Sequence, residues 1–404
     1  MTLLANNDIV PVLTYHSVGM HEPSWTWSQL SERADAFDKL LRALHKRGYR
    51  TVTLAELYAH MAGEKTCPPR SIVLVFDDGY LDNWVTVQPL LKRYGMTGTV
   101  YVNPDFVEPG GAPRPTLDDY PGEWPGGAEV RQSGFMNWAE LAELDRSGVL
   151  DVQSHSLTHT WYFTSPTVED FYSPSNAARY PWMAWNARPE RKPYYLTEDQ
   201  SEFVAWGTPV FEHEKSLIAR RFIPDASAVD AVASAVADRG GADFFKGEGW
   251  RHQLEKTVAD LTGGIDFPGT FESDADYESR VRDELGGSKS IIERKLGKTV
   301  DFLCWPGGGV NDTAKRIATE VGYRSWTLPS SAKPSKRNRP GSDPREIKRL
   351  PALREVLFFG RNWGVGSERL VLLEILAHQE SKVFDLARKA YKVGVAAGIA
   401  GQGR

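Results

Sequence analysis

The run SIVLVFDDGY, residues 71–80, constrains the fold more than any other stretch of this 404-residue chain. Its five consecutive apolar residues are typical of a buried strand, yet they end in two aspartates and a glycine. Side chains alternate between the faces of a strand, and two crowded carboxylates raise at least one pKa unless a cation or donor compensates. The run therefore predicts either a solvated strand end or a site that holds positive charge.

Short apolar strands alternate with amphipathic helices through the first third of the chain. Apolar residues at helical spacing precede Gly48, Thr53 and Glu56 form a capping box, and Asn137 is placed to cap a helix that ends at Gly148. The predicted strands are 11–18, 49–53, 71–76, 98–103 and 149–154. The Pro- and Gly-rich stretch 104–134 predicts a long loop. This alternation indicates a parallel α/β sheet or barrel.

The alternation breaks between about residues 160 and 286. This stretch is rich in aromatic residues and contains an Ala-rich helical pattern around 227–237, so we interpret it as an insertion. The strand and helix pattern then resumes with a helix near 280–296 and the strand TVDFLCW, residues 299–305.

An apolar stripe over residues 367–393 predicts one C-terminal amphipathic helix. We therefore expect an α/β barrel domain over residues 8–364, insertion included, followed by this helix and a tail over 365–404. The stripe consists of Leu372, Ile375, Leu376, Val383, Leu386, Ala387 and Ala390.

Composition excludes several classes of protein. The net charge of −5 argues against a general nucleic-acid binder, and Cys67 and Cys304 are too few for a disulfide scaffold or a thiolate metal site. No stretch approaches the roughly 18 consecutive apolar residues of a membrane helix. The first residues carry no signal-peptide pattern, so we expect a cytoplasmic location.

The motif HSLTH answers the question raised by the two aspartates. His155 and His159 follow a predicted strand four positions apart, and a helical turn directs both imidazoles to one point. One aspartate added to them gives a metal site with open positions for water and substrate, and the other aspartate can then act as general base. Each motif alone also fits an ordinary turn or a chance spacing, but both lie at strand ends, where active sites of such folds gather.

The motifs VFDDG, HSLTH, YHSV and WPGGG resemble those of the polysaccharide deacetylases, the NodB-homology group or carbohydrate esterase family 4. The resemblance covers roughly residues 10–160 and 280–355. It implies a distorted (β/α)7-type barrel, a divalent metal ion and hydrolysis of N-acetyl groups on amino sugars. By motif, Asp77 corresponds to the general base, and the metal ligands are Asp78, His155 and His159. Zn²⁺ is the expected ion, with Co²⁺ or Ni²⁺ as alternatives.

Two departures from the family pattern concern the residues around the base. Many members have an arginine before the proline of the third motif, where this chain has Cys304 and Trp305. Members also use a late Leu-x-His segment for the general acid, and His378 matches it poorly. One branch takes its acid from an N-terminal Tyr-His pair, which resembles Tyr15-His16, so we assign the acid to His16; the alternative is a core or capping histidine.

The loop after the strand at 299–305 is the expected substrate and oxyanion loop. A backbone N–H of the Gly-rich stretch 307–309 is the natural donor to an oxyanion, because glycine allows close approach. The residues assigned to this loop are Trp305, Pro306, Gly307 and Gly308. Cys304 is expected to be inert and buried.

The expected substrate is an acetylated amino-sugar glycan or its lipid- or nucleotide-linked precursor. Aromatic residues of the insertion either grip sugar rings at the barrel mouth or form a satellite core; they include Trp161, Tyr162, Trp182, Trp185, Tyr194, Tyr195 and Trp206. A basic loop either binds a phosphate or is simply solvated; it contains Lys333, Lys336, Arg337, Arg339 and Arg345.

Two other functions remain open. One is an amidase of the same fold that acts on a formyl-sugar, a ureide or a cyclic imide, although some of those enzymes lack the metal histidines. The other is a catalytically silent glycan-binding protein, against which the chemically competent site residues argue. The glycan, the native metal and the oligomeric state are left undetermined by the sequence.

Overall fold

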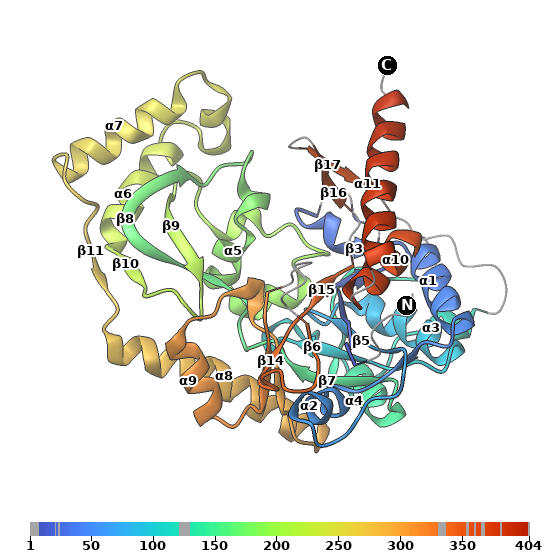
Figure 1. Ribbon diagram of the computed structural model, residues 1–404. Coiled ribbons are helices and arrows are strands. Elements are labelled where there is room, and N and C mark those ends of the chain that lie inside the picture. Colours follow the sequence, from blue (N-terminus) through green and yellow to red (C-terminus); the bar gives the residue numbers. More distant parts are fainter. Residues whose placement is uncertain are drawn as a thin grey trace.

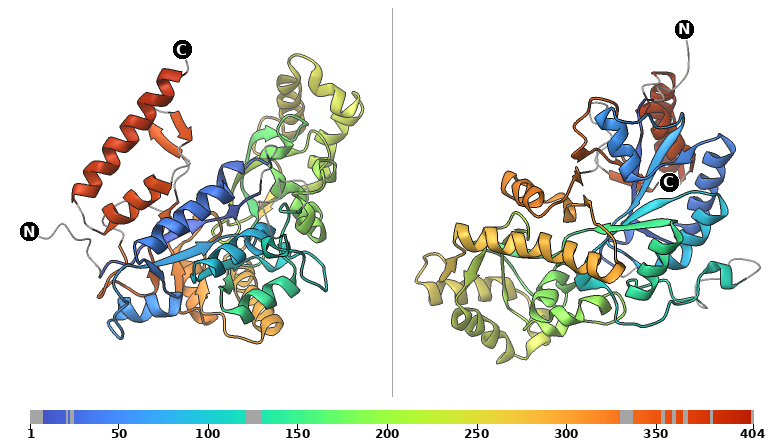
Figure 2. Two further views of the ribbon diagram at one scale, coloured as in Figure 1. Left: turned by 90° about the vertical axis from the view of Figure 1, so that its right-hand side faces the viewer. Right: turned by 90° about the horizontal axis from the view of Figure 1, so that it is seen from below.

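The structure is a computed structural model that describes residues 8–20, 22, 25–120, 130–329, 337–352, 355–358, 361–364, 368–379 and 382–402. Figure 1 shows a barrel with the insertion on one side and the C-terminal elements on the other, and the turned views agree (Figure 2). Among the described residues, no helix is both long and apolar enough to cross a lipid bilayer.

A parallel sheet of nine strands forms the barrel. Its strands are β1 (Val12–Tyr15), β4 (Arg50–Thr51), β5 (Ser71–Phe76), β6 (Gly98–Val102), β7 (Leu150–Ser154), β12 (Phe302–Leu303), β13 (Ser325–Thr327), β14 (Glu346–Ile347) and β15 (Leu350–Pro351). Their order is β14-β13-β12-β7-β6-β5-β1-β15, with β4 also paired to β5. The strands at the two ends of this order are consecutive in sequence, joined only by Lys348 and Arg349. The sheet must therefore curl until its edges meet, which confirms the distorted barrel.

Helices of the barrel form where the sequence predicts them. They are α1 (Ala34–Lys46), α2 (Leu54–Ala62), α3 (Gln88–Arg93), α4 (Trp138–Ser147), α8 (Asp274–Leu296) and α9 (Asp312–Glu320), and a π-helical segment, Asn83–Val87, precedes α3. Both capping predictions are confirmed, since Thr53 caps α2 in a box with Glu56 and Asn137 caps α4. The expected loop between β6 and α4 contains only short 3₁₀ turns at Pro104–Phe106 and Leu117–Asp119 in its described part.

The insertion has its own sheet and core. The strands β8 (Trp161–Phe171) and β9 (Pro209–Lys215) pair antiparallel, as do β10 (Phe222–Pro224) and β11 (Gly269–Phe271), and three helices surround them. The helices are α5 (Pro181–Ala187), α6 (Ala226–Ala237) and α7 (Trp250–Thr262). Phe171, Phe211 and Phe222 belong to a buried cluster apart from the barrel core. The helix α8 begins at Asp274 and packs on α9, so the barrel resumes before the predicted residue 286.

The prediction of one C-terminal helix is wrong. After the hairpin β16 (Glu355–Phe358) and β17 (Arg361–Gly364), the chain forms two helices, α10 (Glu368–His378) and α11 (Lys382–Gln402). Gln379 follows α10, and its side chain donates to the Ile9 carbonyl and accepts from the Tyr49 hydroxyl. These bonds hold the end of α10 against the barrel, and the apolar stripe divides there. Ile375 is buried, whereas Leu386 is 70% exposed.

Candidate active site

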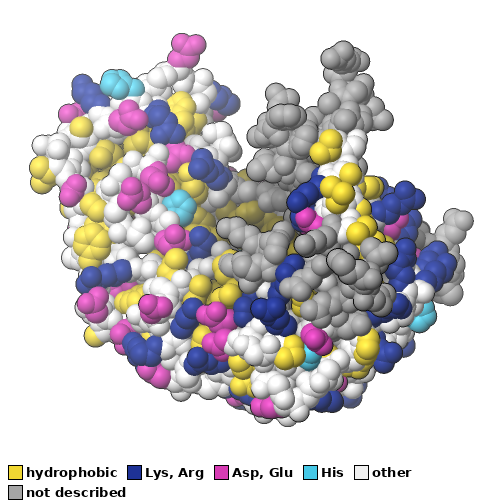
Figure 3. Space-filling view, viewed as in Figure 1, with side chains coloured by type: hydrophobic (Ala, Val, Ile, Leu, Met, Phe, Trp, Pro, Cys, Tyr) yellow, Lys and Arg dark blue, Asp and Glu magenta, His cyan; other side chains and the backbone are white. Residues whose placement is uncertain are grey.

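The predicted motifs converge at the carboxyl ends of the barrel strands. Asp77 and Asp78 follow β5, His155 and His159 follow β7, and His16 follows β1. Neighbouring parallel strands end at the same edge, so these side chains line one cavity of about 280 Å³. Hydrophobic side chains gather in the hollow between the insertion and the C-terminal elements (Figure 3).

Asp78, His155 and His159 have the geometry of a metal site. Nε2 of His155 lies 3.1 Å from Oδ1 of Asp78, and Nε2 of His159 lies 3.4 Å from the same oxygen. This buried oxygen has no conventional hydrogen-bond partner among the described residues, which is costly unless a cation binds it. The two imidazoles and the carboxylate therefore fit a divalent ion with open coordination positions.

A carbonyl group orients the first imidazole. Nδ1 of His155 lies 2.8 Å from the carbonyl oxygen of Cys304, to which the Nδ1–H tautomer donates. That tautomer leaves the lone pair of Nε2 facing Asp78, as a metal ligand requires. Cys304 is fully buried, as expected, and its carbonyl serves the site.

The metal loop has an unusual backbone that neighbouring side chains hold in place. Asp78, Ser156 and His159 have positive φ angles of 74°, 61° and 42°, a region that costs free energy for residues other than glycine. The amide of Asn103 donates to the carbonyls of His155 and Ser156. Lys192, from the insertion, donates to the Thr158 carbonyl at 3.1 Å and to Asp105 at 2.9 Å. The insertion thus helps to fix the loop between the two histidines.

Arg349 holds the candidate base, and the sequence did not reveal it. Nη1 of Arg349 donates to Oδ2 of Asp77 at 2.6 Å, and both side chains are buried. Burial alone raises the pKa of Asp77, but the charges of Arg349 and His16 outweigh it, so the pKa lies below its usual value. The same nitrogen also donates to Sγ of Cys304 at 3.2 Å. The third motif of this chain has no arginine, and the arginine that contacts the candidate base comes from the link between β14 and β15.

The other oxygen of Asp77 remains free for chemistry. Oδ1 is buried and has no hydrogen-bond partner among the described residues. Since Arg349 occupies Oδ2, Oδ1 is the oxygen of Asp77 that remains without a partner among the described residues. The pair of aspartates is therefore divided, with Asp78 facing the histidines and Asp77 facing the arginine.

His16, the expected general acid, also lies beside Asp77. Its Nε2 lies 3.8 Å from Oδ2 of Asp77, and 26% of its side chain is exposed. Burial lowers the pKa of His16, and the two aspartates oppose this shift only in part. Its carbonyl accepts a hydrogen bond from the side-chain amide of Asn83 at 3.0 Å, which fixes the turn after β1. The expected acid is thus placed in the cavity and not in the apolar core.

The WPGGG loop lies at the cavity, but fewer of its residues can serve as oxyanion donors than the sequence predicted. Trp305, Gly307 and Gly308 line the cavity, whereas Pro306 is buried and does not. The N–H groups of Gly308 and Gly309 donate to the carbonyls of Trp305 and Pro306, both at 3.0 Å. These two groups are used within the loop, so of the three glycines only Gly307 is retained as a candidate oxyanion donor.

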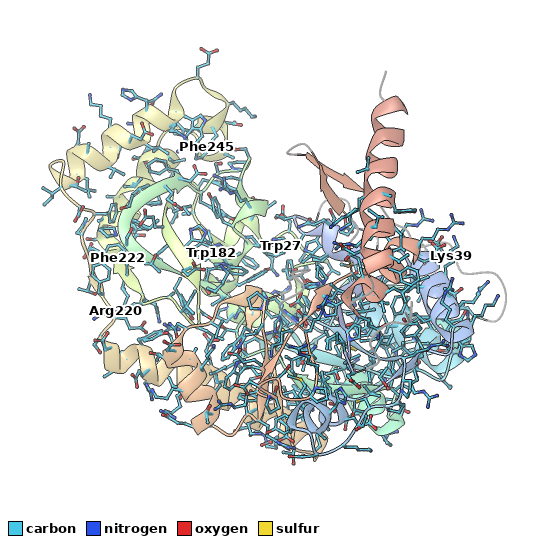
Figure 4. The ribbon with its side chains drawn as sticks, in the orientation of Figure 1. Trp27, Lys39, Trp182, Arg220, Phe222 and Phe245 are labelled. Carbon is cyan, nitrogen blue, oxygen red and sulfur yellow. The ribbon has the colours of Figure 1, made fainter. Side chains whose placement is uncertain are left out.

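The aromatic residues of the insertion divide between the two roles expected of them. Trp161, Trp185 and Tyr195 line the cavity together with Trp27 of the barrel. Trp182 instead packs within the insertion, 5.0 Å from the ring of His213. Figure 4 shows Trp27 between the insertion and the barrel, and Trp182 inside the insertion.

Several other candidate residues lie away from the cavity. His378 does not line it and is buried in α10, and His213, a further histidine of the insertion, does not line it either. Of the basic loop, Lys333 and Lys336 lie outside the described residues, and Arg345 pairs with Asp343 at the surface. A phosphate site in this loop stays a prediction.

The protein is a parallel α/β barrel whose carboxylates and imidazoles lie at the carboxyl ends of the strands. This is where α/β-barrel enzymes have their active sites, and such side chains suit metal-assisted hydrolysis. Residues 64–182 and 249–326 match the family profile described as polysaccharide deacetylase. The matched residues form a polysaccharide deacetylase domain, as the motifs predicted. His16 and Arg349 lie outside the matched residues.

Curated relatives match only part of the chain. It is 31% identical over 93 residues to YxkH of Bacillus subtilis, which is named as a polysaccharide deacetylase; the match covers 23% of this chain and 31% of that protein. It is 28% identical over 127 residues to the poly-β-1,6-N-acetyl-D-glucosamine N-deacetylase of Escherichia coli K12, covering 31% of this chain and 18% of that protein. The chain thus spans less than a third of the length of these relatives.

Solved structures share the fold over most of the chain. The BpsB deacetylase domain of Bordetella bronchiseptica superposes with a TM-score of 0.51 at 19% identity, covering 86% of this chain and 97% of that domain. A de-N-acetylase from Aggregatibacter actinomycetemcomitans gives 0.50 at 18% identity, covering 87% and 98%. At these identities the likeness establishes the barrel fold and no more.

Proposed function

We propose that this protein is a metal-dependent carbohydrate de-N-acetylase that removes acetyl groups from amino sugars of a glycan. One observation carries the proposal: Asp78 converges with two imidazoles, while the adjacent Asp77 is held by a buried arginine and keeps one oxygen free. The family and the relative that acts on poly-β-1,6-N-acetyl-D-glucosamine support this substrate class.

Asp78, His155 and His159 would hold the metal, with Zn²⁺ proposed and Co²⁺ or Ni²⁺ as alternatives. A bound divalent ion supplies a Lewis acid that polarises the acetamide carbonyl and acidifies water. A histidine ligand binds a metal through an unprotonated ring nitrogen, and the hydrogen bond from Nδ1 of His155 to the Cys304 carbonyl selects the tautomer that leaves Nε2 available.

Asp77 acts as the general base in this proposal. Its free Oδ1 removes a proton from the attacking water, while Arg349 keeps the carboxylate ionised and fixes its orientation. The N–H of Gly307 is the proposed backbone donor to the oxyanion that follows attack on the carbonyl.

His16 acts as the general acid. An amine leaves poorly without a proton, and a protonated His16 lies on the cavity wall beside Asp77, where it can supply one. The proton that Asp77 gains and the proton that His16 gives together balance the hydrolysis to acetate and amine.

Acetate release from β-1,6-linked N-acetylglucosamine oligomers, measured before and after exhaustive chelation, tests the proposal. We expect chelation to abolish acetate release and one equivalent of Zn²⁺, Co²⁺ or Ni²⁺ to restore it. Full activity after chelation would refute metal dependence. Release from formyl-sugars, ureides or cyclic imides but not from acetylated sugars would favour the alternative amidase, and binding of glycan without any hydrolysis would favour a silent binding protein.

A further inference from the structure

A buried carboxylate that the proposed mechanism does not use contacts the loop between the two histidine ligands. Glu284, on α8, is 3% exposed and lies outside the lining of the active-site cavity. Its Oε2 accepts a hydrogen bond from the hydroxyl of Thr158 at 2.9 Å. Thr158 directly precedes His159, so this bond joins a helix of the barrel to the metal loop.

The hydrogen-bonding capacity of Glu284 is directed at Thr158. Burying a carboxylate is costly unless hydrogen bonds and charges compensate it. The second oxygen of Glu284, Oε1, has no hydrogen-bond partner among the described residues. Nη1 of Arg280, one turn earlier on α8, lies 3.9 Å from this oxygen and offers charge without a hydrogen bond. Arg280 itself donates to the Ser216 carbonyl and to the Glu272 carboxylate, at 2.7 and 2.8 Å.

Thr158 is held from two sides. Lys192 donates to its carbonyl at 3.1 Å, while Glu284 accepts from its hydroxyl. Both of these side chains are only 3% exposed, so bulk water does not compete for the contacts. The Thr158 carbonyl belongs to the peptide group that leads into His159. The two contacts together therefore fix that peptide group.

His159 depends on such a restraint. Its φ angle of 42° is costly for a residue other than glycine, and such a conformation persists only where the surrounding structure enforces it. In this conformation Nε2 of His159 lies 3.4 Å from Oδ1 of Asp78. The ring of His155 is oriented directly by the Cys304 carbonyl, whereas His159 is held through the backbone of its neighbour.

We propose that Thr158 and Glu284 are positioning residues of the metal site. Their hydrogen bond keeps His159 in the strained conformation in which its Nε2 faces the ion, although neither side chain is a ligand. This inference rests on the proposed metal site for its ion, and it extends the support of that site to α8.

Four variants of the intact, chelator-treated protein test the hydrogen bond, with Zn²⁺ affinity measured by competition with a metal indicator. Thr158→Val removes the hydroxyl at constant shape, and Glu284→Leu removes its acceptor. Each should weaken Zn²⁺ binding about tenfold, as expected for partners that orient a ligand. Thr158→Ser keeps a hydroxyl and Glu284→Gln keeps an acceptor oxygen, so both should stay within about twofold of the wild type.

The double variant Thr158→Val/Glu284→Leu distinguishes one shared contact from two separate structural effects. It should bind Zn²⁺ no more weakly than the weaker single variant, because both substitutions remove the same bond. Glu278→Leu is the matched control, since Glu278 lies on the same helix with 44% of its side chain exposed, and it should bind Zn²⁺ normally. If Glu284→Leu does not fold, Thr158→Val and Thr158→Ser decide the question alone.

Wild-type affinity in Thr158→Val, or additive losses in the double variant, would overturn the positioning role. Acetate release with metal restored separates it from the proposed function. Acetate release by the wild type, with Zn²⁺ affinity unchanged in every variant, means that the proposed function stands and the positioning role is wrong. The expected pattern of affinities in a protein that never releases acetate means that the positioning role stands and the proposed function is wrong.

Discussion

The barrel rim, where the carboxyl ends of the strands meet the cavity, contributes buried charged and polar side chains to the cavity wall. The insertion contributes mainly aromatic faces. Hydrogen bonds fix Asp77 through Arg349 and His155 through the Cys304 carbonyl. Trp161 and Trp185 instead meet the cavity through ring surfaces. The difference suits the proposed division of labour, with the reaction carried out by the barrel and the substrate contacted by the insertion.

Substitution of the two aspartates should give the largest changes in activity and should distinguish the general base from the metal ligand. Asp77→Asn should lower acetate release about 10²–10⁴-fold, because the amide cannot accept the proton, while metal content is retained. Asp78→Asn should lose metal affinity, because a neutral amide replaces an anionic ligand. Metal stoichiometry and acetate release are measured on both variants together. Equal metal loss in both would show that both carboxylates are ligands.

Arg349→Met breaks the buried pair beneath the rim. Removing one partner of a buried ion pair costs about 3–5 kcal/mol of stability, measured by denaturant unfolding. Burial then raises the pKa of Asp77 with only the neighbouring histidines opposing it, so the acidic limb of the pH–rate profile should move to higher pH. The double variant Arg349→Met/Asp77→Asn should recover much of the stability, since no unpaired charge remains. An unchanged acidic limb would exclude Arg349 as the residue that orients the base.

His16→Ala should lower turnover about 10²-fold and leave metal content unchanged. An acid works only while protonated, so the wild-type rate should fall as pH rises through the pKa of His16. Because burial lowers that pKa below about 6.5, the alkaline limb should lie on the acidic side of neutrality and disappear in the variant. His252→Ala, at an exposed histidine of the insertion, should change neither limb. Near-normal activity of His16→Ala would place the acid elsewhere.

Lys192→Met tests a polar contact by which the insertion acts on the rim. Loss of its bonds to Thr158 and Asp105 should loosen the metal loop and weaken metal affinity about tenfold, with little change at saturating metal. Competition with a metal indicator measures this affinity. Lys246→Met, at an exposed lysine of the insertion, is the control and should bind metal normally. Equal affinity of both variants would mean that the two regions are independent.

The sequence predicted those residues of the rim that lie in short contiguous motifs. FDDG and HSLTH each follow an apolar strand, and parallel strands bring their ends together, so Asp77, Asp78, His155 and His159 were predictable. The arginine was not, because its partner is 272 positions away and meets it only when the sheet closes. Its one trace in the sequence is a basic residue directly before a short apolar strand at Leu350–Pro351.

The separation of α10 from α11 was also not predictable from local sequence, because it depends on distant residues. Apolar periodicity continues past Gln379, and it alone favours one long helix. The bonds of Gln379 to Ile9 and Tyr49 come from residues distant in sequence, so local pattern cannot report them. Likewise, the run 299–305 predicted a full strand, but only Phe302–Leu303 has strand conformation.

The position of Arg349 has a consequence for biosynthesis. A nascent chain that has emerged through HSLTH already carries all three proposed metal ligands and the base, but it lacks the arginine, which enters with the last strand of the barrel. Contacts so distant in sequence form late, since the closure of long loops is entropically costly. The contact between Arg349 and Asp77 is therefore expected to form late in folding, after the contacts among residues 77–159.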